Sequence, residues 1–198
     1  AAGSAQPADS GISMADYVRR DLSLTGIFNI LNKQSFLAGN DAGAAVEGKI
    51  NFADWTAVGA DYLLTGSISQ QQKEIIVEGR LFDVVRGELI FNKKYRAEAG
   101  RSKGIARAIA ADIMRILIND EGDFNTRIAF VSKNGLRSDI RAVSYDGVEI
   151  NNLTNHQSIL MAPRWSADGR WLAFTSFKRG RPEVYIKDFT NGTEKRVA

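Results

Sequence analysis

Alternating apolar and polar residues, separated by tight-turn pairs, fill residues 162–198. Asp168-Gly169 and Asn191-Gly192 are pairs that tolerate the positive φ angles of hairpin turns. The pattern predicts four short antiparallel strands, which is the size of one β-propeller blade. The predicted strands are Arg164–Ser166, Trp171–Ser176, Val184–Phe189 and Glu194–Val197.

The same pattern occurs once more upstream. Arg127–Ser132 aligns with Trp171–Ser176 at an offset of 171 − 127 = 44 residues, and Leu153-Thr154 aligns with Val197-Ala198 at the same offset. Between them, Ile140–Gly147 matches Val184–Gly192 with one extra residue. A strand-and-turn period of roughly 40–45 residues is typical of propellers. We therefore predict two blade repeats, about 126–154 and 162–198, with a generic β-meander or sandwich as the alternative.

The first part of the chain has mixed helix and strand periodicity, which predicts an α+β (α/β) domain with a mixed sheet and packed helices. Apolar residues at helical spacing precede Gly26, and a long hairpin surrounds residues 85–87. The last predicted helix carries a broad apolar stripe and should lie across the sheet. The predicted helices are 12–24, 52–58 (capped by Asn51) and 102–118 (capped by Ser102), and the predicted strands are 27–31, 62–69, 74–84 and 88–97.

A polar, acidic segment at residues 119–123 breaks the apolar pattern. It predicts an N-terminal α/β domain at 1–123 and the start of a β-propeller at 124–198. Three carboxylates in this segment suggest a calcium loop, but they lack the EF-hand spacing.

Composition excludes several kinds of site. The 198-residue chain has no cysteine and a single histidine, which excludes disulfides, thiolate catalysis and multi-histidine metal sites. Residues 43–49 have the spacing of a phosphate-binding loop, but Ile50 stands where Ser or Thr is needed.

No apolar run reaches the roughly 18–20 residues that cross a bilayer. The small, polar start predicts that any signal peptide is absent or removed. We expect no cofactor.

Charge is unevenly distributed along the chain. The chain has 26 basic and 23 acidic residues; 12 and 7 of them fall in residues 124–198, so that part carries 12 − 7 = +5 and residues 1–123 carry 14 − 16 = −2. Basic character on the repeats suits an acidic protein partner or nucleic acid. A solvated basic surface is the simpler interpretation.

At this point the motifs resemble the TolB family. The blade sequence of residues 164–176, followed by Gly180–Tyr185, closely resembles a TolB propeller repeat, although prolyl-oligopeptidase-type propellers use similar blades. The upstream segments Gly59–Gly66 and Phe124–Phe130 look like the family's N-terminal domain and its junction. The resemblance covers nearly the whole chain. Ala167 stands where the repeat usually has proline.

The resemblance implies a non-enzymatic periplasmic scaffold of the Tol–Pal cell-envelope system, with roles in outer-membrane integrity and cell division. It implies binding to the peptidoglycan-associated lipoprotein (Pal) through propeller loops and to TolA through the N-terminal region. Association with the outer membrane would be peripheral, through the lipoprotein. The family has six blades and an additional N-terminal segment that binds TolA. That segment is missing or truncated here. Only two repeats are present, which leaves an open ring, so we expect that the chain continues, that the blades pack against a second copy in an oligomer, or that they are partly disordered.

Candidate contact residues follow from blade geometry. Alternate connections of an antiparallel blade emerge at the same end, so the longer connections 133–139, 153–162 and 177–183 should share one rim, and long loops on a rigid scaffold suit recognition. The resemblance implies that His156 and its neighbours face the propeller opening. Alternatively, residues 159–161 enter the core and His156 is a solvated loop residue. The candidate residues are Lys133, Arg137, His156, Gln157, Met161, Lys178, Arg179 and Arg181.

Two other functions remain open at this stage. The chain could be the regulatory propeller of a prolyl-oligopeptidase-type serine peptidase, although no G-x-S-x-G nucleophile motif is present. Nucleic-acid binding is suggested by the basic repeats, but their aromatic residues fall at blade-core positions, and we therefore expect no nucleic-acid partner.

Overall fold

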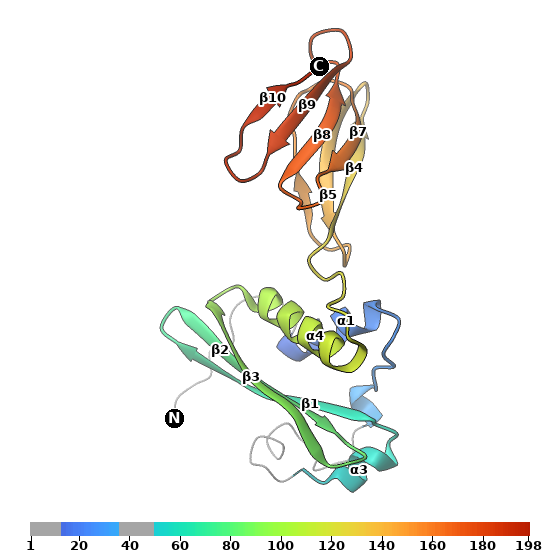
Figure 1. Cartoon of the computed structure of the whole chain (residues 1–198), viewed down its shortest axis with the longest axis vertical. Coiled ribbons are helices and arrows are strands. Elements are labelled where there is room, and N and C mark those ends of the chain that lie inside the picture. Colours follow the sequence, from blue (N-terminus) through green and yellow to red (C-terminus); the bar gives the residue numbers. More distant parts are fainter. Residues whose placement is uncertain (1–12, 36–49) are drawn as a thin grey trace. The chain divides into compact units, whose positions relative to one another are not determined.

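The computed structural model describes residues 13–35 and 50–198. The chain divides into two compact units, with the boundary between Phe124 and Asn125 (Figure 1). The phosphate-loop-like segment at 43–49 lies outside the described residues.

The first unit combines helices with a three-stranded antiparallel sheet of order β1-β2-β3. All described pairings in this sheet are antiparallel, so the sheet is not mixed. Its elements are α1 (Met14–Leu24), a short 3-10 helix at Lys33–Ser35, α3 (Phe52–Ala57), β1 (Tyr62–Gln71), β2 (Glu74–Asp83), β3 (Glu88–Glu98) and α4 (Ser102–Ile118).

The predicted strand at residues 27–31 is wrong, because this segment forms neither helix nor strand. Leu31 instead packs against a small cluster around Trp55 and Val84, so its apolar character serves packing and not strand pairing. The two predicted caps differ in outcome. Asn51 occupies the predicted N-cap position of α3, although its side chain makes no cap hydrogen bond and its amide donates to Asp54. The predicted Ser102 cap is wrong, because Ser102 is the first residue of α4 and Arg101 is the N-cap.

Helix α4 lies over one face of the sheet, as its apolar stripe predicts (Figure 1). Ile105, Ile109 and Ile113 are buried on the helix, and Ile75 and Val77 are buried on β2. Helix α1 packs beside α4. The paired helices therefore shield the apolar face of the β-hairpin from water.

The second unit contains two antiparallel sheets whose turns follow the predicted pattern. Gly169 and Gly192 adopt φ angles of 66° and 72°. The sheet order is β4-β5-β6 in one sheet and β10-β9-β8-β7 in the other, so the four antiparallel strands predicted for residues 162–198 are present. The strands are β4 (Arg127–Asn134), β5 (Arg137–Ser144), β6 (Ile150–Asn152), β7 (Leu160–Trp165), β8 (Trp171–Ser176), β9 (Glu183–Asp188) and β10 (Glu194–Arg196).

One apolar cluster joins the two sheets of the second unit. Ile140 from β5, Leu160 from β7, and Leu172 and Phe174 from β8 are almost fully buried. The Ser138 hydroxyl donates to the Leu160 carbonyl at 3.1 Å, which ties the start of β5 to the start of β7. Because the sheets share a core, the loops at their ends are held on a rigid base.

None of the helices in the described ranges is both long and apolar enough to cross a membrane. Within residues 13–35 and 50–198, no group of three or more His, Cys, Asp or Glu side chains is arranged to hold a metal ion.

Candidate protein-binding loops

The connections between β4 and β5, between β6 and β7, and between β8 and β9 meet at one end of the second unit. An isolated bridge between Ser138 and Ser158 joins the first two of them. Arg137 donates from its guanidinium to the Gln157 side chain at 3.4 Å, beside that bridge. The Phe177 amide donates to the Ile159 carbonyl at 3.0 Å, which brings the third connection to the same place.

The connection around residues 133–139 is shorter than predicted. Asn134 pairs directly with Arg137, so only Gly135 and Leu136 form the turn, with Gly135 at a φ of 61°. Lys133 and Arg137 therefore project from strands, and both are exposed. The sequence contains a hairpin signal here, Asn134-Gly135, which fits a tight turn better than a loop.

His156 is placed inside the unit and not on its surface. Its side chain is only 8% exposed and packs edge-on against Phe174 and Tyr185, with ring centroids 5.3 and 5.7 Å away. Nδ1 lies 2.9 Å from the Ser176 hydroxyl and Nε2 lies 2.8 Å from the Glu194 carboxylate. Because an ionised carboxylate only accepts hydrogen bonds, Nε2 carries a proton and donates to Glu194.

Glu194 and Lys178 extend this arrangement outward. Lys178 Nζ lies 3.0 Å from Glu194 Oε1 and 4.0 Å from the centre of the Tyr185 ring. Burial alone would raise the pKa of the Glu194 carboxyl, but the hydrogen bonds from His156 and Lys178 outweigh it and lower that pKa. Glu194 is therefore held as a carboxylate between two donors.

Serine, histidine and glutamate thus stand in a row, the order of a hydrolase triad. Ser176 is 0% exposed, so no substrate can reach its hydroxyl. Its hydroxyl also accepts from the Lys178 amide at 3.3 Å. The row is a structural connection between β8, β10 and the segment that precedes β7.

The remaining candidates differ in their surroundings. Arg179 and Arg181 belong to the β8–β9 turn and approach the buried carboxylate of Glu183. Gln157 is exposed beside Arg137. Met161 lies in β7, 51% exposed, and pairs with Thr175. Leu160 is buried, whereas Ile159 and Met161 are about half exposed, so only the middle residue of the segment 159–161 enters the core.

Ser176, Glu183 and Glu194 complete the surroundings of these loops, and sequence reasoning missed all three as loop partners. His156 lies 20 residues from Ser176 and 38 from Glu194, so no local spacing indicates these contacts. Glu183 pairs with Ser176 across β8 and β9. Aligning these two neighbouring strands in the sequence would therefore have indicated that Glu183 and Ser176 lie side by side.

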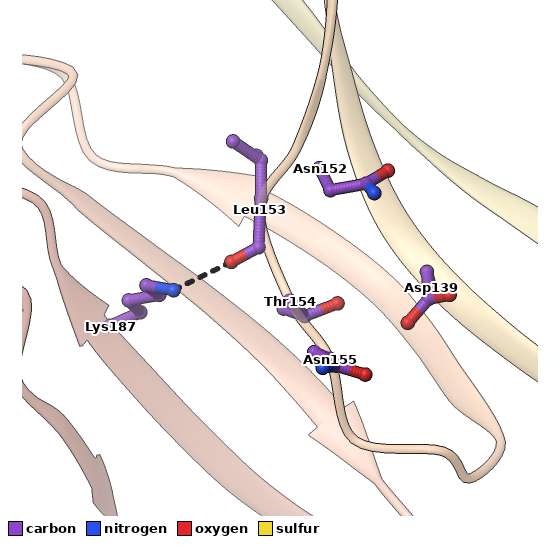
Figure 2. A pocket seen from close by; sticks show the side chains of 6 residues that line it. All are labelled: Asp139, Asn152, Leu153, Thr154, Asn155 and Lys187. Atoms are coloured by element: carbon purple, nitrogen blue, oxygen red, sulfur yellow. Dashed lines mark hydrogen bonds between the residues drawn. The ribbon is translucent and has the colours of Figure 1, made fainter.

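A shallow depression of about 420 Å³ lies elsewhere on this unit, beside the segment that follows β6 (Figure 2). Lys187 donates to the Leu153 carbonyl at 2.7 Å across it. Its lining is Asp139, Asn152, Leu153, Thr154, Asn155 and Lys187, and none of the sequence-predicted contact residues belongs to it.

Comparisons with known proteins agree with this architecture. The family description "TolB amino-terminal domain" matches residues 1–90, and "TolB beta propeller domain" matches residues 115–198. The chain belongs to the TolB family. The matches cover both units, so the TolB assignment rests on the helices and hairpin as well as on the propeller sheets.

Similar proteins carry the same family name. A "Tol-Pal system protein TolB" from Syntrophus aciditrophicus is 32% identical over 184 residues, covering 91% of this chain and 41% of the relative. One from Desulfosudis oleivorans is 34% identical over 178 residues, covering 90% of this chain and 41% of the relative. The chain thus spans about two fifths of the length of these TolB relatives.

A solved structure shows the same fold. The crystal structure of TolB from Acinetobacter baumannii superposes with a TM-score of 0.83 at 27% identity, covering 96% of this chain and 47% of that one. The predicted fold class, an α/β domain followed by propeller sheets, is confirmed.

Proposed function

We propose that this TolB-family chain is a non-enzymatic protein-binding scaffold of the Tol–Pal system in the periplasm, with roles in outer-membrane integrity and cell division. It binds the peptidoglycan-associated lipoprotein through the loops at the end of the propeller sheets, and TolA through its N-terminal region. The relatives named above are described as Tol–Pal system proteins, and this description supports the proposal that the chain acts in the Tol–Pal system.

The observation that carries the proposal is the convergence of exposed side chains on rigid strand ends. Arg137 is the first residue of β5 and Gln157 lies in the β6–β7 connection, and the Arg137 guanidinium donates to the Gln157 side chain at 3.4 Å. Their backbones are fixed by the Ser138–Ser158 bridge and by the shared core beneath it. A rigid, exposed and basic surface of this kind loses little entropy when a partner binds.

The serine-peptidase alternative is less favourable. A TolB family match covers residues 1–90 of the first unit, which a peptidase propeller would not require. The buried Ser176 leaves the serine–histidine–glutamate row without access to substrate.

The test is binding of the purified chain to the soluble domain of Pal, measured by biolayer interferometry. We expect Arg137→Glu with Gln157→Ala to weaken binding by about tenfold, because a charge reversal and a lost hydrogen bond act at the contact surface. The matched control is Arg127→Glu, which makes the same charge change on the same strand pair, opposite Ser144 at the far end.

Equal weakening by the Arg127 control would show that net charge alone matters and would contradict a loop-specific contact. Absence of Pal binding by the unaltered chain would remove the proposed partner. Binding of TolA, tested in parallel, examines the first unit separately.

A further inference from the structure

Three arginines surround one buried carboxylate at the β8–β9 turn. Glu183 is only 3% exposed in its side chain, and its Oε1 lies 2.9 Å from Arg196 Nη1 and 3.3 Å from Arg181 Nε. Its Oε2 lies 3.9 Å from Arg179 Nε. The Tyr185 hydroxyl donates to Oε2 at 2.9 Å and fixes the carboxylate from below. We call Arg179, Arg181, Glu183 and Arg196 the arginine cluster.

The arginine cluster has more positive charge than Glu183 neutralises. Three guanidinium groups and one carboxylate give 3 − 1 = +2. Burial alone would raise the pKa of Glu183, but the hydrogen bonds from Arg196, Tyr185 and Arg181 lower it, so the carboxylate stays ionised. The described residues place no second carboxylate within 4.0 Å of these three guanidinium groups.

The three guanidinium groups are exposed to solvent, although the Glu183 carboxylate that they contact is buried. Arg179, Arg181 and Arg196 side chains are 61%, 74% and 45% exposed. A guanidinium has five N–H donors, and the contacts with Glu183 occupy one nitrogen of each. The neighbouring Glu194 is already occupied by Lys178 and His156, so it does not compete for these donors.

Geometry and charge together match a particular ligand chemistry. Guanidinium groups bind carboxylates and phosphates through paired, charge-assisted hydrogen bonds. A net charge of +2 suits two adjacent negative charges better than one. Clusters of arginine held in place by a buried acid are pre-organised, which lowers the entropy cost of binding.

We infer that the arginine cluster is an anion-binding site that takes two neighbouring carboxylates from an acidic protein segment. The inference rests on the proposed function in one respect, namely that the two carboxylates belong to a protein partner. The site is formed by the β8–β9 turn, β9 and β10, so it is a contact additional to the Arg137–Gln157 pair.

The experiment titrates the full chain with a small probe and follows amide chemical shifts by NMR. The probe is the peptide acetyl-Gly-Glu-Glu-Gly-amide, and the comparison peptide has Gln-Gln in place of Glu-Glu. We expect the Glu-Glu peptide to shift the amides of Arg181, Glu183 and Arg196, and the Gln-Gln peptide to leave them unchanged. Inorganic phosphate is titrated separately.

Variants test the site itself. Arg181→Gln should weaken peptide binding about fivefold by removing one charge-assisted contact. Glu183→Gln keeps the Tyr185 hydrogen bond but removes the internal counter-ion, so it should tighten binding. Arg170→Gln is the matched control, because Arg170 is 46% exposed and paired with Asp188 at the opposite end of the same sheet. It should change affinity less than twofold.

The outcomes separate this inference from the proposed function. Peptide binding that is weakened by Arg181→Gln and tightened by Glu183→Gln supports the site, even if Pal does not bind. Peptide binding that is unaffected by Arg181→Gln overturns the site, and Pal binding by the same chain would then leave the proposed function standing. Phosphate binding without peptide binding, or equal weakening by Arg170→Gln, also overturns the carboxylate assignment.

Discussion

The only histidine of the chain acts as a packing residue that joins three segments. His156 contributes an aromatic face to Phe174 and Tyr185, and a hydrogen bond at each ring nitrogen. When the imidazole is neutral, Nδ1 accepts from the Ser176 hydroxyl; when it is charged, Nδ1 donates to the same oxygen. A hydroxyl can donate or accept, so Ser176 is able to hydrogen-bond to Nδ1 with either tautomer of the ring.

Glu194 is the part of this connection that responds to pH. Its folded pKa is lower than the ordinary value of 4.5. A lowered pKa means that the carboxylate stabilises the fold above the unfolded value, and that this stability disappears as the pH falls through the folded value. We therefore predict that the free energy of unfolding falls as the pH drops below about 4.5, and that Glu194→Gln makes this fall shallower. Urea denaturation at several pH values between about 3 and 6 measures it.

The control for Glu194→Gln is Glu88→Gln. Glu88 is exposed and, within the described residues, forms no ion pair, so its replacement should leave the pH dependence unchanged. If Glu194→Gln and the unaltered chain lost stability equally over this pH range, the proposed contribution of Glu194 would be wrong.

Helix α4 is attached to its sheet by one buried carboxylate in addition to its apolar stripe. Asp112 is 8% exposed in its side chain and accepts from Lys93 at 2.6 Å, from the Tyr95 hydroxyl at 2.7 Å and from Arg115. Burial would raise the pKa of Asp112, but the bonds from Lys93 and Tyr95 lower it. Burial and the same hydrogen bond raise the pKa of Tyr95 above its usual range.

Asp112→Ala should destabilise the chain by about 2–4 kcal/mol, because the Tyr95 hydroxyl and the Lys93 ammonium lose their shared acceptor. Asp112→Asn should cost less, since the amide oxygen still accepts from Tyr95. Glu98→Ala is the control: Glu98 is 78% exposed and pairs with Arg101, so the expected change is below about 0.5 kcal/mol. Urea denaturation of the three variants compares them, and equal costs for Asp112→Ala and Glu98→Ala would refute the assignment.

The elements predicted most accurately are those whose secondary structure is determined by the hydrophobic pattern of their own residues. Trp171–Ser176 has the predicted limits and helix α4 ends at the predicted Ile118, because alternation and the helical stripe continue to these ends; only the start of α4 differs, since Ser102 is its first residue and not its cap. The segment 27–31 was predicted wrongly, because alternation alone does not show whether a segment pairs with a strand, and here Leu31 packs against the Trp55 cluster instead. The surroundings of His156 could not be predicted, because Glu194 reaches it only through the folded order β10-β9-β8-β7.

At the scale of the whole molecule, charge differs between the two units. Residues 124–198 carry 12 − 7 = +5, whereas residues 1–123 carry 14 − 16 = −2. Part of the excess lies in the arginine cluster, which is fixed and exposed, so it acts at the surface where a partner would arrive. Exposed charges attract a partner over distances up to the Debye length, about 8–10 Å at physiological salt.

This asymmetry predicts that salt slows association with the proposed protein partner. Raising the ionic strength from about 0.05 to 0.5 M should lower the association rate constant about tenfold or more, because long-range attraction is screened. The dissociation rate should change less, since it depends on short-range contacts. Stopped-flow or interferometry measurements at several salt concentrations separate the two rates. A salt-insensitive association rate would show that the basic charge of the second unit does not guide the partner. Arg181→Gln should make the association rate less dependent on salt, and should speed dissociation at high salt by a smaller factor.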